Sequence, residues 1–288
     1  MNKLSPPTYD DNAALDSLAS NKLLGSFPRL TRHLPKLKAG YIQYVAAKGD
    51  VTAVNPVIIP KITAGFLRGH YGSPPKAIEY ITAMRLDSDA NTCPMCGSLH
   101  SGTLDHLMDK ESHPAFSIFA QNLVPACKCN SKRLKPLVGP NAGERILHPY
   151  FDAVLAERIV AGRFTDLGPA PHVETRIVLD TTHPHHAAAV FHHDSVIMRT
   201  AIHRYLGKRW AMLIRRPSLA VPDLALDPVD RLELMTMIIS ERDRTDESRE
   251  SRNNWDSVFL TGLLDDDVLD WLYGRFSRGG RRLGGTLL

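Results

Sequence analysis

Residues 93–133 read CPMCGSLHSGTLDHLMDKESHPAFSIFAQNLVPACKCNSKR, and this stretch contains all four cysteines of the 288-residue chain. The cysteines form two close pairs, a CxxC and a CxC, namely Cys93 and Cys96, then Cys127 and Cys129. Polar residues suited to catalysis lie between the pairs or directly after them: Asp105, His106, Asn122 and Asn130. One short window therefore combines sulfur donors with oxygen and nitrogen donors, and the interpretation of the whole chain starts from it.

Each cysteine pair places two thiolates on one tight turn. A structural zinc takes four ligands in a tetrahedral arrangement, and two such turns supply them. Four thiolates leave no open position for a substrate, so we predict a structural zinc that joins the ends of a module too small for its own core. The CxC spacing is tighter than CxxC and leaves the role of Cys127 open. His100 or His113 could replace one thiolate, and the alternative to a metal site is four free cysteines.

The pattern Asp105-His106 with Asn130 supplies groups that phosphodiester hydrolysis needs. Imidazole titrates near neutral pH, so His106 is the candidate base that deprotonates water. Carboxylate and amide oxygens are hard donors, so Asp105 and Asn130 are candidate ligands for a catalytic Mg²⁺ or Mn²⁺. Neighbouring side chains of a regular strand point to opposite faces. Asp105 and His106 therefore share a site only if the strand is irregular there, or if metal and water lie on different sides of the phosphate.

Basic residues cluster directly after the first cysteine of the second pair: Lys128, Lys132, Arg133 and Lys135. The net charge of the whole chain is only +4, which identifies no partner by itself. The position of the cluster beside the candidate metal site is more informative, because cations there would hold the phosphates of a nucleic acid. We therefore expect these four side chains to contact nucleic acid.

The motif LDH…HPAFS…QNLVPACKCN resembles the HNH (ββα-metal) endonuclease family, over about residues 93–135. The resemblance implies that Asp105 and Asn130 are metal ligands and that His106 is the general base. It also implies that Asn122 braces the loop backbone so that His106 is correctly aimed. Members of this family cut nucleic acid with one divalent metal, and many belong to phages, mobile elements or anti-phage defence systems. DNA cleavage, in such a defence system, is the function that the resemblance favours.

Two features depart from the family pattern, namely Asp109-Lys110 where many relatives have Pro-Lys, and the short CxC spacing.

Three other interpretations of the function stay open. The window could be a zinc module that binds nucleic acid without cutting it. It could be a ribonuclease, because the phosphate chemistry does not distinguish the sugar. The chain could also be an effector that stays silent until an ATPase or sensor partner releases it.

The predicted fold class is α+β, a mostly helical chain around a central zinc-stabilised ββα module. We expect a helical region over 1–90, the nuclease module over 91–147, and a mainly helical region with one or two strands over 148–288. The helices and strands predicted from periodicity and from Gly/Pro breaks are as follows: helices at 12–24, 75–85, 149–160, 195–214, 228–247 and 255–276, and strands at 173–179 and 187–191. The histidine-rich segment 183–193 is expected to be a polar loop rather than a metal site, and the Gly-rich end 279–288 is expected to be disordered.

No apolar run approaches the roughly 18–20 residues that span a bilayer, so no membrane association is expected. The first residues, MNKLSPPTYDDNAALDS, lack the apolar stretch of a signal peptide. Paired cysteines without an export signal are typical of metal ligands in a reducing compartment. The sequence therefore predicts a cytoplasmic protein, and it leaves the oligomeric state open.

Overall fold

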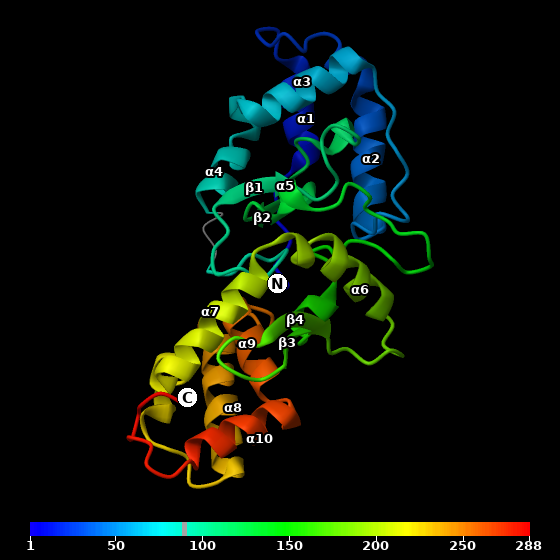
Figure 1. Ribbon diagram of the computed structural model, residues 1–288. Coiled ribbons are helices and arrows are strands. Elements are labelled where there is room, and N and C mark those ends of the chain that lie inside the picture. Colours follow the sequence, from blue (N-terminus) through cyan, green and yellow to red (C-terminus); the bar gives the residue numbers. More distant parts are fainter. Residues whose placement is uncertain (88–90) are drawn as a thin grey trace.

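The computed structural model describes residues 1–87 and 91–288. Figure 1 shows helices at both ends of an elongated molecule, with a small sheet and a short helix between them. The described residues form two antiparallel two-stranded sheets. The prediction of a mostly helical α+β fold is therefore confirmed. The boundary expected at residues 90–91 adjoins 88–90, which lie outside the described residues.

Over residues 1–87 the N-terminal region is built from four α-helices, namely α1 (Asp11–Ser20), α2 (Leu34–Ala46), α3 (Lys61–Gly72) and α4 (Tyr80–Leu86). The side chain of Asp10 accepts a hydrogen bond from the Ala13 amide and so caps α1. The helices bury an apolar face that includes Leu18 and Tyr44, and these pack in one cluster with Phe116 of the module. The N-terminal core thus extends into the cysteine-bearing window.

The module consists of two strands and a short helix, in the order that the resemblance implies. Strand β1 (Thr103–His106) pairs with β2 (Leu123–Ala126), with His106 opposite Leu123. Helix α5 (Cys129–Lys132) follows directly. In Figure 1 this unit lies between the N-terminal helices and the C-terminal region.

The C-terminal region combines a hairpin with five helices, listed here with their bounds: β3 (Val160–Thr165), β4 (His172–Ile177), α6 (His186–Ser195), α7 (Ile202–Arg215), α8 (Arg231–Ser248), α9 (Trp255–Leu263) and α10 (Asp266–Phe276). Helix α9 packs closely on β3, where a Cβ at Gly262 would lie 2.6 Å from the Gly162 carbonyl oxygen. Trp210 and Phe259 fill the core beside this contact. Short 3-10 turns complete the chain: Leu30–His33, Lys76–Ile78, Pro114–Phe116, Ala120–Asn122, Ala153–Ala156, η6 (Ile197–Arg199), Pro217–Leu219 and Pro222–Ala225.

Several local predictions are wrong in this region. Residues 149–160 form turns and a 3-10 segment that lead into β3, not a helix, and residues 187–191 lie in α6, not in a strand. The helix expected over 255–276 is two helices, α9 and α10, separated at Leu264 and Asp265. The segment 279–288, expected to be disordered, docks on α7, because the buried Leu287 donates its amide hydrogen to the Ile214 carbonyl. None of the helices in the described part of the chain combines the length and apolar character of a membrane span.

Candidate functional site

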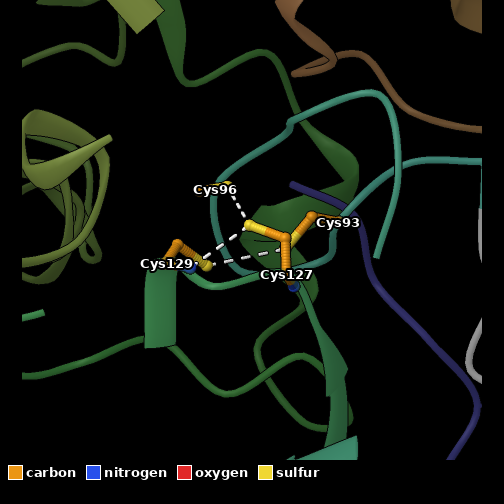
Figure 2. A group of neighbouring side chains, drawn as sticks. All are labelled: Cys93, Cys96, Cys127 and Cys129. Atoms are coloured by element: carbon orange, nitrogen blue, oxygen red, sulfur yellow. Dashed lines mark hydrogen bonds between the residues drawn. The ribbon is translucent and has the colours of Figure 1, made fainter. Parts of the chain in front are cut away.

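The four cysteine sulfurs converge on one point (Figure 2), and all lie within 4.8 Å of one another. Cys93 and Cys129 are 3.7 Å apart at sulfur, and Cys96 and Cys127 are 3.5 Å apart. Among the described residues, no other group of three or more His, Cys, Asp or Glu side chains is arranged to hold a metal ion. Both thiols of the CxC point inward, so this cluster could hold a metal ion without a histidine ligand.

The thiols strongly perturb one another. Hydrogen bonds from the neighbouring thiols, led by Cys129, lower the pKa of Cys127, whereas the hydrogen bond with Cys127 raises the pKa of Cys129. The physical cause is that one thiolate is stabilised by the surrounding S–H donors, while further negative charge in the same small space is repelled. A cation at the centre would allow all four sulfurs to ionise, which is how thiolates bind metals.

The CxxC turn is held by the C-terminal region through three successive carbonyl groups. His192 Nε2 donates to the Met95 oxygen at 2.6 Å. Trp255 donates its indole N–H to Cys96 and its backbone N–H to Gly97, both at 2.9 Å. His192 Nδ1 accepts from the Leu147 amide, which assigns the hydrogen to Nε2, and burial lowers the pKa of His192 to about 4. The cysteine cluster is therefore joined to α6 and α9.

Gly97 is required for this contact. Its φ is +79°, and a Cβ there would lie 2.0 Å from the Asn253 carbonyl oxygen. Any other residue would therefore be strained and would push the turn away from the segment that precedes α9.

His106, the candidate base, is held on several sides and is almost fully buried. Its Nε2 lies 2.9 Å from the Ser117 carbonyl oxygen, which can only accept, so Nε2 carries the hydrogen and Nδ1 keeps the lone pair. Nδ1 lies 3.7 Å from Asp105 Oδ1. The ring of Tyr71, from α3, packs against the imidazole with ring centroids 4.3 Å apart. The structure thus assigns Nδ1 as the basic nitrogen.

Asp105 shares the site with His106 because β1 ends there. The His106 amide donates to Asp105 Oδ1 at 2.8 Å, which turns the carboxylate towards the imidazole. Burial alone would raise the pKa of Asp105, but its interactions with the His106 residue, whose amide donates to it, and with the Asn130 side chain outweigh burial and lower it. The carboxylate is therefore ionised at neutral pH, as a ligand for a cation must be.

Two buried polar atoms beside Asp105 have no hydrogen-bond partner among the described residues. Asn130 donates through Nδ2 to the His106 carbonyl at 2.9 Å, but its Oδ1 has no donor. Arg133 donates through Nη2 to the Leu107 carbonyl at 2.5 Å, but its Nη1 has no acceptor. Leaving a buried polar group unpaired costs about 1–3 kcal/mol. An unpaired oxygen and an unpaired guanidinium nitrogen could accept a cation and an anion respectively.

Asp105, His106, Asn130 and Arg133 all line one pocket of about 540 Å³. The remaining lining residues come from the loop after β1 and from α5 and the residues that follow it: Asp109, Lys110, Glu111, Ser112, Ser131, Leu134 and Lys135. Of the four basic residues predicted to contact nucleic acid, Arg133 and Lys135 line this pocket. Lys128 and Lys132 are exposed but lie outside its lining.

Lys110 was not predicted as a site residue, yet it lines the pocket, and its ammonium lies 4.9 Å from the centroid of the Tyr71 ring.

A larger pocket, of about 670 Å³, lies elsewhere, between the first residues and the end of α8. Its lining contains no imidazole or thiol, and Arg158 and Asp246 in its wall pair with each other. The smaller pocket is therefore the better candidate for chemistry.

Asn122 braces the loop that precedes Ser117. Its Oδ1 accepts from the Met108 amide at 2.9 Å, and its Nδ2 donates to the carbonyls of Met108 and Phe116 at 3.0 and 3.1 Å. The fully buried amide thus ties both ends of residues 108–116 together. The bracing contacts are therefore present, and the role that the resemblance assigns to them, the aiming of His106, stays a prediction.

Sequence reasoning missed a supporting chain behind Asn122. Tyr44 O–H lies 3.1 Å from Asn122 Oδ1, and His148 Nε2 lies 3.0 Å from the same hydroxyl. His148 Nδ1 accepts from the Tyr150 amide, so Nε2 donates to Tyr44, and Tyr44 donates to Asn122. The Tyr44 and Asn122 contact joins residues 78 positions apart, so no local pattern could have revealed it.

Comparisons with known proteins find a local likeness. A stretch of 69 residues is 32% identical to protein ea31 of Escherichia phage lambda, covering 23% of this chain and 23% of ea31. The chain thus aligns with less than a quarter of that relative's length. No family model matches the chain. No solved structure matches it. These comparisons establish similarity to a piece of one phage protein, and the function must be argued from the site.

Proposed function

We propose that the protein is a metal-dependent endonuclease of the HNH type that hydrolyses phosphodiester bonds in DNA. One observation carries the proposal: a single pocket is lined by a histidine with a free Nδ1, a carboxylate, an unpaired amide oxygen and an unpaired guanidinium nitrogen. The reaction requires a base, a metal site and a phosphate site. The histidine would supply the base, the carboxylate and the amide oxygen would supply the metal site, and the guanidinium nitrogen would supply the phosphate site.

His106 would take the proton of the attacking water on Nδ1. The Ser117 carbonyl holds the hydrogen on Nε2, which keeps the ring in the tautomer that the base needs. Once Nδ1 is protonated, the Asp105 carboxylate at 3.7 Å stabilises the imidazolium. Arg133 Nη1 would donate to a phosphate oxygen, and Lys135 on the pocket wall would hold a neighbouring phosphate.

Asp105 and Asn130 fit a hard divalent cation. Both offer oxygen, and the Asn130 oxygen is buried without a donor, so a bound ion would satisfy it. Two protein ligands leave positions for water and substrate, which suits Mg²⁺ or Mn²⁺. When bound, such an ion would neutralise the charge that develops on the phosphate and on the departing 3′ oxygen.

We assign zinc to the cysteine cluster, because four thiolates in a tetrahedral arrangement are a typical structural zinc site. The role would be structural, since all four positions are taken by protein. Four thiols arranged as metal ligands suit a reducing compartment, and the proposal therefore includes a cytoplasmic location. We extend the proposal to an effector role in anti-phage defence on the basis of the resemblance to HNH endonucleases, because the likeness to ea31 is to a piece of a phage protein and carries no functional detail.

The test is a cleavage assay with plasmid DNA and with single-stranded RNA, each with Mg²⁺, Mn²⁺ or EDTA. His106→Gln keeps an amide near the Ser117 carbonyl but removes the base, so cleavage should fall by about 10²–10⁴-fold. Zinc content and melting temperature should stay close to the wild type. His100→Ala, at an exposed histidine, serves as the matched control. Undiminished cleavage by His106→Gln would refute the assignment, cleavage of RNA alone would make the protein a ribonuclease, and nucleic-acid binding without any cleavage would favour a non-catalytic zinc module.

A further inference from the structure

The hydroxyl group of Thr175, on β4, is surrounded by donor atoms from three other elements. His193 Nε2, from α6, lies 2.8 Å from Thr175 Oγ1, and His203 Nε2, from α7, lies 3.3 Å from it. Met198 Sδ, from η6, lies 3.6 Å from the same oxygen. Two imidazole nitrogens, a thioether sulfur and a hydroxyl therefore meet at one place.

The donor set is rich in lone pairs. His193 Nδ1 lies 2.7 Å from Asp194 Oδ1, and a carboxylate only accepts, so Nδ1 carries the hydrogen and Nε2 presents a lone pair to Thr175. The Met198 sulfur is also an acceptor only. The hydroxyl has one hydrogen to offer, so it can satisfy only one of these two acceptors at a time. A cation in this position would satisfy both, together with the hydroxyl oxygen.

We propose that this cluster is a second metal site, which binds a divalent transition-metal ion of borderline softness such as Zn²⁺, Ni²⁺ or Co²⁺. His193 and His203 would ligate through Nε2, with Met198 and Thr175 completing the set. Imidazole suits these ions, and a thioether excludes harder ions such as Mg²⁺ and Ca²⁺. Asp194 would orient His193, as carboxylates do for metal-bound histidines.

Only small movements are needed to form the site. Both nitrogens already contact the same oxygen, so side-chain rotation would bring them onto one ion. Met198 is 41% exposed, and its thioether can rotate freely. His193, by contrast, is buried and fixed by Asp194, which gives the site one rigid ligand.

The sequence offered a different grouping. It placed five histidines of segment 183–193 together, but the His192 imidazole is occupied with the Met95 carbonyl, whereas His193 contacts Thr175. Only His193 of that segment contributes here. Its partners His203 and Met198 come from beyond the segment, and β4 provides the hydroxyl. The proposed site is independent of nuclease activity and would stand if no cleavage were found.

The experiment is a titration of Co²⁺ into the full chain after its cysteine cluster has been filled with Zn²⁺. Cobalt on nitrogen and thioether ligands gives weak visible bands, whereas cobalt on thiolates adds an intense charge-transfer band, so the two locations are distinguishable. We expect one Co²⁺ to bind without the charge-transfer band and to raise the melting temperature. His193→Ala and His203→Ala should each weaken binding by at least about tenfold, and Asp194→Asn by about tenfold.

His100→Ala is the matched control and should leave Co²⁺ binding unchanged. His203→Gln, at a half-buried ring, keeps the test valid if His193→Ala fails to fold, and circular dichroism verifies folding. The proposal is overturned if no additional Co²⁺ binds, if the charge-transfer band shows that the ion has entered the cysteine cluster, or if His203→Gln binds as tightly as the wild type. The last result would mean an adventitious surface ion only.

Discussion

Asn and Asp side chains have nearly the same shape. Even so, Asn122→Asp should be among the most destabilising of the substitutions in this protein that preserve side-chain shape. The substitution replaces the Nδ2 donor with an oxygen, so the carbonyls of Met108 and Phe116 lose their donor and face a second acceptor. The side chain is fully buried, so water does not compensate. At about 1–3 kcal/mol for each unpaired buried group, two carbonyls amount to about 2–6 kcal/mol. This is a large part of the 5–15 kcal/mol typical of a folded domain.

The measurement is urea-induced unfolding, followed by far-ultraviolet circular dichroism, with Asn55→Asp at an exposed position as the control. The control should change the free energy of unfolding by less than about 0.5 kcal/mol. Cleavage should also fall in Asn122→Asp below its melting temperature, because Ser117, which orients His106, directly follows the braced loop. An Asn122→Asp protein within about 1 kcal/mol of the wild type would refute the argument that this amide holds the loop.

Two further predictions concern the cysteine cluster and His148. Removing the metal with a chelator should shift the fluorescence of Trp255 and speed hydrogen exchange at the start of α9. The reason is that Trp255 donates two hydrogen bonds to the CxxC turn. An unchanged exchange rate at the start of α9 would contradict this link between the cysteine cluster and α9. Burial lowers the pKa of His148 from 6.5 to about 3, so between these pH values the unfolded chain binds a proton that the folded chain does not, and stability falls as the pH falls. From pH 7 to pH 4 this one group should cost about 3 kcal/mol, at about 1.4 kcal/mol per unit, and the thermal melting of His148→Gln should depend less on pH than that of the wild type.

The local features of the cysteine-bearing window were predictable from sequence because short-range geometry fixes them. A CxxC turn and a CxC turn each bring two thiols together, so the spacing alone indicated the cluster, and the structure brings all four sulfurs within 4.8 Å. Asn130 lies in the first turn of α5, which begins at Cys129. The position of His106 beside Asp105 was left open, and it depended on where β1 ends.

The failures have two physical causes. Residues 187–191 contain three consecutive alanines, which favour helix, and the strand prediction gave too little weight to that propensity. In residues 149–160 the apolar residues suggested a helical stripe, but pairing with His172–Ile177 draws the chain into β3 from Val160 onward. Tertiary pairing of this kind overrides local pattern. Tyr44, Tyr71 and His148 could not be predicted because their roles depend on contacts far along the chain.

The position of the β1–β2 sheet explains why both ends of the chain matter to the pocket. Side chains alternate across a strand, and in β2 Leu123 packs into the N-terminal core while Val124 and Ala126 pack into the C-terminal core. The module therefore gives one face to each region and has no core of its own. The C-terminal region holds the CxxC turn through Trp255, whereas the N-terminal region holds the loop before Ser117 through Tyr44 and Asn122. His106, on β1, lies between these two attachments, so we expect a disturbance in either region to change the geometry at Nδ1 without touching a pocket residue.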